Sequence, residues 1–398
     1  MFKIHKALSL CLPIALIFTS SCKDTATDKD KDKKDTTKTV QKEKEVVIPI
    51  DQKATTLAAL ISGLPVEDTT GFGSVAKMPV VKQQMDFLNK GWAGLDSKYL
   101  APMRKWRDAE IADMNKEGNT LFYPFSGPDF LNAYNIFPNC DNFLMFGLEG
   151  VGHMPNDFGK KNEQYVTAYM GDIRNALEDV MARNYFITSY MGSDLYRRSQ
   201  GVAPIINVFM ARTGNKVISI NKVFLDKDGK PTLKPLDDKK ENVEVYGLAI
   251  QFINKDRKKP QTLYYFGTDV EDSKMKKKQN LENFIRSFPN KVGYLKSASY
   301  ILFNPNFLTI KKLVMEETKA VLQDDTGVRF KDYMESGKWK VQLYGGYARP
   351  VADFGGYTYQ PELAAEFKKD SLVKKLGFPY GYHWKEVQKV SVLVARRK

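Results

Sequence analysis

The sequence predicts an α+β fold in which helices are mixed with a central antiparallel meander. Long stretches carry apolar residues at three- and four-residue spacing, which is typical of amphipathic helices. Between them lie short apolar runs bounded by glycine, asparagine and aspartate, which is typical of strands and turns. No repeat and no linker interrupts residues 46–398, so we expect a single domain or two interleaved lobes.

The first half of this region is expected to be mostly helical. The clearest helix spans residues 163–185, where apolar side chains recur along one face and Asn162 offers a helix cap. The other expected elements are helices at 78–89 and 98–114, a strand at 119–125, a short helix at 127–135 and a strand at 142–147.

The second half is expected to contain the meander. Strands at 203–212 and 216–225 would flank Thr213-Gly214-Asn215, a three-residue hairpin loop, and 243–253 with 261–267 would form a second pair. Helices at 281–287 and 306–322, a strand at 339–344, a helix at 362–369 and a strand at 390–395 complete the expected order.

The N-terminus has the pattern of an export signal. Lys3 and Lys6 precede an apolar run at 7–18, which is shorter than the roughly 20 residues that a membrane-spanning helix needs. The following Thr19-Ser20-Ser21-Cys22 resembles the lipobox of bacterial lipoproteins, although Thr19 replaces the usual apolar residue. The resemblance implies removal of residues 1–21 and a membrane anchor of fatty-acyl chains, such as palmitate, on Cys22.

Residues 22–45 are expected to form a disordered tether. The stretch 23–45 holds eight lysines and seven acids but no aromatic residue, so it cannot bury enough surface to fold. Cys22-Lys23-Asp24 resembles the signal of Bacteroidota-type surface lipoproteins, although residues 25–27 interrupt the acidic run. We expect a lipid-anchored protein of the cell envelope, in the outer membrane. The sequence leaves open whether the anchor lies in the inner leaflet or displays the protein at the cell surface.

Net charge indicates an acidic partner. Of the total charge of +14, the leader carries +2 and the tether +1, which leaves +11 for residues 46–398. Lysine clusters at 255–259, which includes Lys258 and Lys259, and at 274–278 flank one expected strand. Such a surface attracts acidic glycans or envelope polymers. Without a nucleic-acid-binding motif, we expect no nucleic acid as partner.

Few side chains suit catalysis. Asp324-Asp325-Thr326-Gly327 contains the tripeptide of aspartic proteases, but it occurs once and a helix is expected before it. If the protein hydrolyses a substrate, Asp324 and Asp325 are the first candidates, with His153 as a helper. No metal site and no cofactor are predicted, because Gly150 and Gly152 argue against a helix that would align ligands with His153.

Cys140 is the only thiol that remains if Cys22 carries lipid, and we expect it to be a buried apolar residue.

Aromatic residues gather on glycine- and proline-rich loops near the C-terminus, where rings can stack on sugars or peptides. The candidate ligand-binding rings are Tyr357, Tyr359, Tyr380, Tyr382 and Trp384.

Residues 121–149 and 295–349 resemble a group of exported bacterial proteins of unassigned function, which implies a common fold and no particular chemistry. Three functions follow as hypotheses: a binding or structural lipoprotein for an acidic envelope polymer or glycan, an envelope hydrolase that uses Asp324 and Asp325, and an accessory subunit of an envelope complex.

Overall fold

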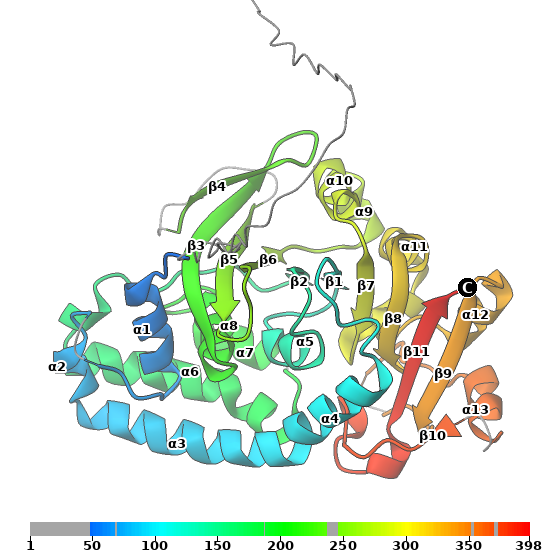
Figure 1. The fold of residues 1–398 in the computed structure, drawn as a ribbon, viewed down its shortest axis with the longest axis horizontal. Coiled ribbons are helices and arrows are strands. Elements are labelled where there is room, and N and C mark those ends of the chain that lie inside the picture. Colours follow the sequence, from blue (N-terminus) through cyan, green and yellow to red (C-terminus); the bar gives the residue numbers. More distant parts are fainter. Residues whose placement is uncertain (1–47, 68–69, 187, 237–245, 352–353, 370–372) are drawn as a thin grey trace, which may run out of the picture. The chain divides into compact units, whose positions relative to one another are not determined.

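The computed structural model describes residues 48–67, 70–186, 188–236, 246–351, 354–369 and 373–398 (Figure 1). Cys22, the predicted leader and the predicted tether lie outside these residues. The described residues form one folded domain of mixed helices and strands, which confirms the predicted fold class. Among them, no helix has the length and apolar character needed to cross a membrane.

The strands form one sheet of eleven, in the order β10-β9-β11-β8-β7-β1-β2-β6-β5-β3-β4. The five strands from β8 to β6 in that order run parallel. Of the expected meander, the strands β3, β5 and β6 pair antiparallel, but at one end of the sheet instead of its centre, and β4 pairs antiparallel with the outer side of β3. The strands are β1 (Thr120–Tyr123), β2 (Asn142–Gly147), β3 (Asn215–Leu225), β4 (Pro231–Pro235), β5 (Tyr246–Asn254), β6 (Gln261–Gly267), β7 (Lys291–Leu295), β8 (Thr318–Asp324), β9 (Trp339–Gly345), β10 (Val373–Lys374) and β11 (Ser391–Arg397).

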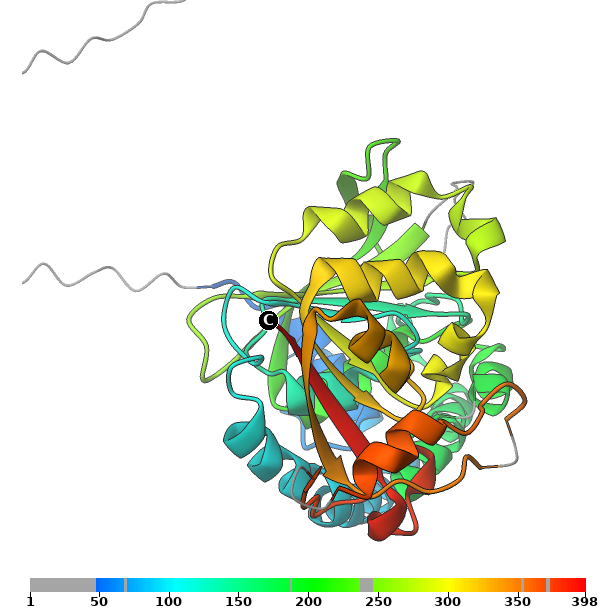
Figure 2. The same ribbon diagram turned by 90° about the vertical axis from the view of Figure 1, so that its right-hand side faces the viewer.

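Helices cover both faces of the sheet, so the domain has three layers (Figures 1 and 2). One face packs against α1 (Gln52–Ile61), α2 (Gly73–Ala76), α3 (Pro79–Leu95), α4 (Ala101–Glu110), α5 (Phe130–Ile136), α6 (Glu163–Arg183), α7 (Thr188–Leu195) and α8 (Ala203–Arg212). The other face packs against α9 (Asp272–Met275), α10 (Gln279–Ser287), α11 (Leu308–Glu317), α12 (Phe330–Ser336) and α13 (Pro361–Phe367). Strands β1 and β7 are buried along their whole length, as expected for parallel strands covered on both faces.

Two expected elements are wrong. Residues 203–212 form helix α8 instead of a strand, and Ala203 to Met210 are all buried. A helix that is buried on every side has no amphipathic period to separate it from a buried strand. The expected helix 306–322 ends at Glu317, and strand β8 follows at once. A strand therefore does precede Asp324.

One long helical segment is not regular. Helices α3 and α4 are joined through η1 (Asp96–Leu100), a turn of π-helix. Such turns add a residue to the helix and are frequent beside functional sites.

Candidate functional site

The loops that follow the central parallel strands enclose a small cavity of about 50 Å³. The chain leaves β1 for α5 on one face of the sheet, whereas it leaves the neighbouring β7 for α11 on the opposite face. Adjacent parallel strands whose connections diverge in this way open a crevice at their carboxyl ends, where ligands of such sheets usually bind. The lining comes from residues 125–129 after β1, Glu149 after β2 and residues 296–298 after β7, with Tyr123, Tyr185, Phe186 and Tyr382.

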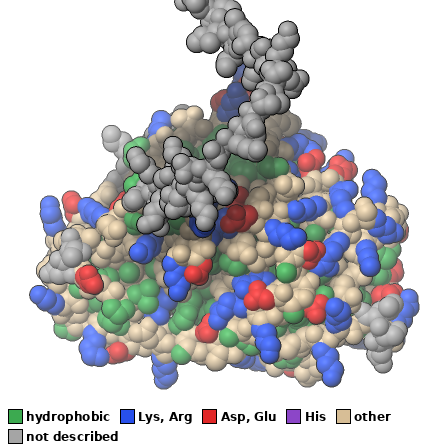
Figure 3. Space-filling view, viewed as in Figure 1, with side chains coloured by type: hydrophobic (Ala, Val, Ile, Leu, Met, Phe, Trp, Pro, Cys, Tyr) green, Lys and Arg blue, Asp and Glu red, His purple; other side chains and the backbone are tan. Residues whose placement is uncertain are grey.

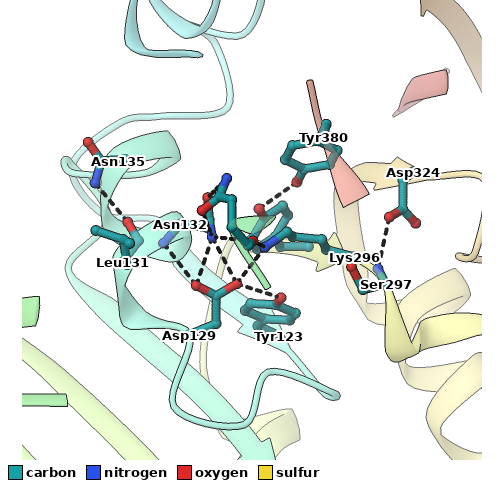
Figure 4. A network of polar contacts seen from close by, with 11 residues as sticks. Tyr123, Asp129, Leu131, Asn132, Asn135, Lys296, Ser297, Asp324 and Tyr380 are labelled. Atoms are coloured by element: carbon teal, nitrogen blue, oxygen red, sulfur yellow. Dashed lines mark hydrogen bonds and ion pairs between the residues drawn. The ribbon is translucent and has the colours of Figure 1, made fainter. Parts of the chain in front are cut away.

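A buried ion pair forms one wall of the cavity. Lys296 Nζ lies 3.0 Å from Asp129 Oδ2, and the two side chains are 1% and 5% exposed. Asp129 also caps α5 by accepting from Asn132 N at 3.1 Å, and it accepts from the Tyr123 hydroxyl at 3.2 Å. A second Lys296 hydrogen bond, of 2.5 Å, goes to the carbonyl of Asn184 at the end of α6. Figure 4 shows Lys296 reaching from its loop to Asp129, so this network ties three separate elements together.

Ser297, the next residue, has an unusual backbone. Its φ of 59° and ψ of −92° lie outside the regions that residues other than glycine usually adopt. It stands between strand β7 and helix η3 (Ala298–Phe303), and its buried hydroxyl has no hydrogen-bond partner among the described residues. Strain of this kind persists only where surrounding contacts enforce it, and it gathers at functional sites. Serine nucleophiles on strained strand-to-helix turns have this placement.

The carboxylate of Asp324 holds Ser297 in place. Asp324 Oδ2 accepts the Ser297 backbone N–H at 2.8 Å, and Oδ1 accepts from the backbone N–H and the hydroxyl of Thr326 at 3.0 and 2.5 Å. Burial, and then the neighbouring Asp325 carboxylate, raise the pKa of Asp324 to about 7. Burial also raises the pKa of Asp325 to about 6, although a hydrogen bond from the Tyr357 hydroxyl opposes the shift.

The C-terminal loop completes the surroundings of Asp324. Gly381 has a φ of +58°, and a Cβ atom on it would lie 2.5 Å from Asp324 Oδ2. Only glycine fits so close to the carboxylate. The next residue, Tyr382, lines the cavity, and its ring stacks on Phe354 with the ring centres 4.1 Å apart.

The predicted catalytic residues do not all meet. Asp324 and Asp325 lie together at the end of β8, as expected from their adjacency, and both are buried. His153 lies in the loop after β2, where its backbone N–H donates to the Ser199 carbonyl, and it does not line the cavity. No group of three or more His, Cys, Asp or Glu side chains suited to a metal occurs in the part of the chain that the structure describes.

Cys140 is fully buried, as predicted. Burial, and then the nearby Asp141 carboxylate, raise the pKa of the Cys140 thiol far above its usual range. A thiol held in its neutral form is a poor nucleophile.

The predicted aromatic residues divide into two kinds. Tyr357 and Tyr380 are buried, and their hydroxyls donate to Asp325 and to the Tyr294 hydroxyl. Tyr382 is partly exposed at the cavity, Tyr359 is 48% exposed and stacks on a neighbouring ring, and Trp384 is partly exposed between two lysines. Of these rings, Tyr382 is the one that lines the cavity.

The two lysine clusters lie at opposite ends of β6. Lys258 and Lys259 are exposed on the turn between β5 and β6, whereas residues 274–278 follow the far end of β6. The two clusters are therefore separate surface features instead of one patch.

Sequence reasoning missed Lys296 and Ser297. Strand β7 has only five residues, and a lysine at its start and a glycine in its middle obscured its apolar pattern. Because that strand was not predicted, the sequence did not indicate that Lys296 and Ser297 follow the carboxyl end of a parallel strand. The pairing of Asp129 with Lys296 spans 167 positions in the sequence, so no local pattern indicates it.

Comparison with known proteins adds no relative: no protein-family model and no curated sequence matches this chain.

Proposed function

We propose that this protein is a lipid-anchored hydrolase of the bacterial envelope, in which Ser297 is the nucleophile and Asp324 its base. The observation that carries the proposal is Ser297 itself: a strained residue at the carboxyl end of a central parallel strand, with a buried hydroxyl that no described residue bonds. The anchor on Cys22 and the envelope location rest on the lipobox resemblance of the sequence.

The chemistry follows from the position of Asp324. Its Oδ2 already accepts the Ser297 N–H at 2.8 Å, so rotation about the serine Cα–Cβ bond brings the hydroxyl toward the same oxygen. Oγ bonds to the carbonyl carbon of an ester while its proton passes to Asp324. That proton moves to the leaving oxygen when the ester C–O bond breaks. A water molecule repeats both transfers, which frees the acid and the serine.

The pKa of Asp324 suits this task. A general base is most effective when its pKa lies near the working pH, and burial raises the pKa of Asp324 to about 7. The base is the ionised carboxylate, so the rate should rise with pH through this region and level off above it. Lys296 is already bonded to Asp129 and Asn184, so it positions the loop that carries Ser297 instead of accepting a proton.

A fluorophosphonate probe tests the proposal, because such probes phosphonylate activated serines. We expect labelling at Ser297, located by peptide mass spectrometry, together with slow hydrolysis of a short-chain nitrophenyl ester. Ser297→Ala should abolish both signals. Ser299→Ala is the matched control, since Ser299 is also a buried serine with an unbonded hydroxyl but does not line the cavity. Absence of labelling, or labelling that persists in Ser297→Ala, would refute the assignment.

Binding of an acidic envelope polymer is the second candidate function. Exposed Lys255, Lys258 and Lys259 on the β5–β6 turn support it. In the view of Figure 3, however, basic side chains alternate with acidic ones and do not form one continuous field. Neutralising the three lysines should weaken retention on an acidic polysaccharide column at low salt, because surface attraction is screened by ions. Unchanged retention would count against this function.

A further inference from the structure

A second and larger cavity, of about 470 Å³, lies at the amino ends of β2 and β6. Ser297, in contrast, follows the carboxyl end of the parallel strand β7. Its volume falls within the range of small-molecule sites, roughly 300–1,000 Å³. Its walls come from the segment formed by α3, η1 and α4, from α5, from the residues at the end of α8 and from the β5–β6 turn. Four of the lining residues are arginines and two are aspartates.

Arg212 is the unusual member of this set. Its guanidinium donates from Nε to the Ser62 carbonyl at 2.7 Å, from Nη1 to Asn89 Oδ1 at 2.7 Å and from Nη2 to the Gly63 carbonyl at 3.4 Å, which are all neutral partners. Among the described residues, no carboxylate lies within ion-pair distance of it. Burial lowers the pKa of Arg212 to about 10, and no neighbouring acid offsets the shift.

The surroundings of Arg212 favour a planar anionic group. The guanidinium carbon lies over the Trp92 ring, 5.5 Å from its centre, which is within the range of a cation–π contact. These hydrogen bonds leave one N–H on Nη1 and one on Nη2, and guanidinium N–H groups of this kind bind carboxylate or sulfate oxygens.

A second arginine has an unused donor. Arg257 is 5% exposed, and it donates from Nη1 to the Asn139 carbonyl at 2.7 Å and from Nη2 to Asp141 at 2.6 Å. Its Nε–H has no partner among the described residues. That nitrogen is shielded from solvent, so Arg257 contributes to the cavity through the charge of its side chain in the wall, which Asp141 partly balances, and not through its Nε–H.

The π-helical turn adds an independent sign of function. Asp96 and Leu100, the first and last residues of η1, both line the cavity. The turn interrupts an otherwise regular helix at this place, and such interruptions are frequent at binding sites.

We propose that this cavity binds a small organic anion through the guanidinium of Arg212, which lies over the Trp92 ring. A sugar that carries a carboxylate or sulfate has the required size and charge. The site is separate from Ser297, so it does not depend on the proposed hydrolase activity.

Isothermal calorimetry on the whole protein at low salt, with glucuronate as the probe, tests the proposal. Glucose, inorganic sulfate and inorganic phosphate are the comparison ligands. We expect glucuronate to bind, sulfate to compete, and glucose to show no binding. Binding of the inorganic ions without glucuronate would overturn the organic ligand, and binding of glucose as tight as that of glucuronate would overturn the anion site.

Two variants should shift the affinity in opposite directions. Arg212→Gln should weaken glucuronate binding about tenfold or more, as expected for loss of hydrogen bonds from a charged group. Asp256→Asn removes a negative charge from an exposed turn residue that lines the cavity, and it should tighten binding about threefold. Because Asp256 is exposed, this second variant keeps the test valid if Arg212→Gln fails to fold.

Matched controls separate the site from general charge effects. Arg329 stacks on the Phe303 ring at 4.7 Å but does not line this cavity, so Arg329→Gln should leave glucuronate affinity unchanged. Asp228 lies on the exposed β3–β4 turn, so Asp228→Asn should also have no effect. If Arg329→Gln changed the glucuronate affinity as much as Arg212→Gln, or if Asp228→Asn changed it as much as Asp256→Asn, the proposal would be overturned.

Discussion

Lys296 and Asp129 are each about 95% buried or more, so replacing Lys296 by methionine should be costly. Methionine fills similar space but cannot pair with the carboxylate at 3.0 Å. Removing one partner of a buried ion pair costs about 3–5 kcal/mol, because the other charge stays buried without compensation. Hydrogen bonds from Tyr123 and Asn132 still reach Asp129, so we expect a loss near 3 kcal/mol in the free energy of unfolding.

Urea denaturation followed by circular dichroism measures this loss, provided that the slope of the free energy against urea is unchanged. Lys82→Met is the control, since Lys82 and Asp86 form an exposed pair in which each side chain is more than 60% exposed. Exposed pairs contribute about 0–1 kcal/mol, so this variant should change little. The double variant Lys296→Met with Asp129→Asn should recover part of the loss. A loss below about 1 kcal/mol for Lys296→Met would refute the view that this pair joins the three elements.

Three further outcomes follow from the structure. Gly381→Ala should lower the unfolding free energy by about 1–3 kcal/mol in urea denaturation, because the new methyl group would meet Asp324 Oδ2 at 2.5 Å; a stability equal to that of the parent protein would contradict the observed packing. The free energy of unfolding should fall as pH rises from about 4 to about 7, by up to about 1.4 kcal/mol per pH unit for one group, because the folded protein holds the Asp324 proton with a raised pKa. Asp324→Asn should flatten that slope in denaturation series at several pH values, and an unchanged slope would assign the effect to other groups. The Cys140 thiol should react with a maleimide only after denaturant is added, since it is fully buried, so rapid labelling at Cys140 in the native protein, located by peptide mass spectrometry, would disprove its burial.

The sequence alone was sufficient for the elements that carry a clear local signal. Helix α6 was predicted with its cap at Asn162, because spacing along one face and capping are both properties of neighbouring residues. The antiparallel pair of β5 and β6 was also predicted, since its strands are joined by a short turn. The burial of Cys140 followed from its residue type and its apolar neighbours.

Only the tertiary structure decided which residues meet. Parallel strands pair over long separations, so the order of β8, β7, β1, β2 and β6 left no local trace in the sequence. That order brings Asp129 and Lys296 together across 167 positions and places Ser297 beside Asp324. The tertiary structure also showed that 203–212 is a helix. Because this segment is buried on every side, its sequence lacks the period that distinguishes a helix from a strand. The candidate acids could be named from the sequence, but the serine beside them depended on long-range packing.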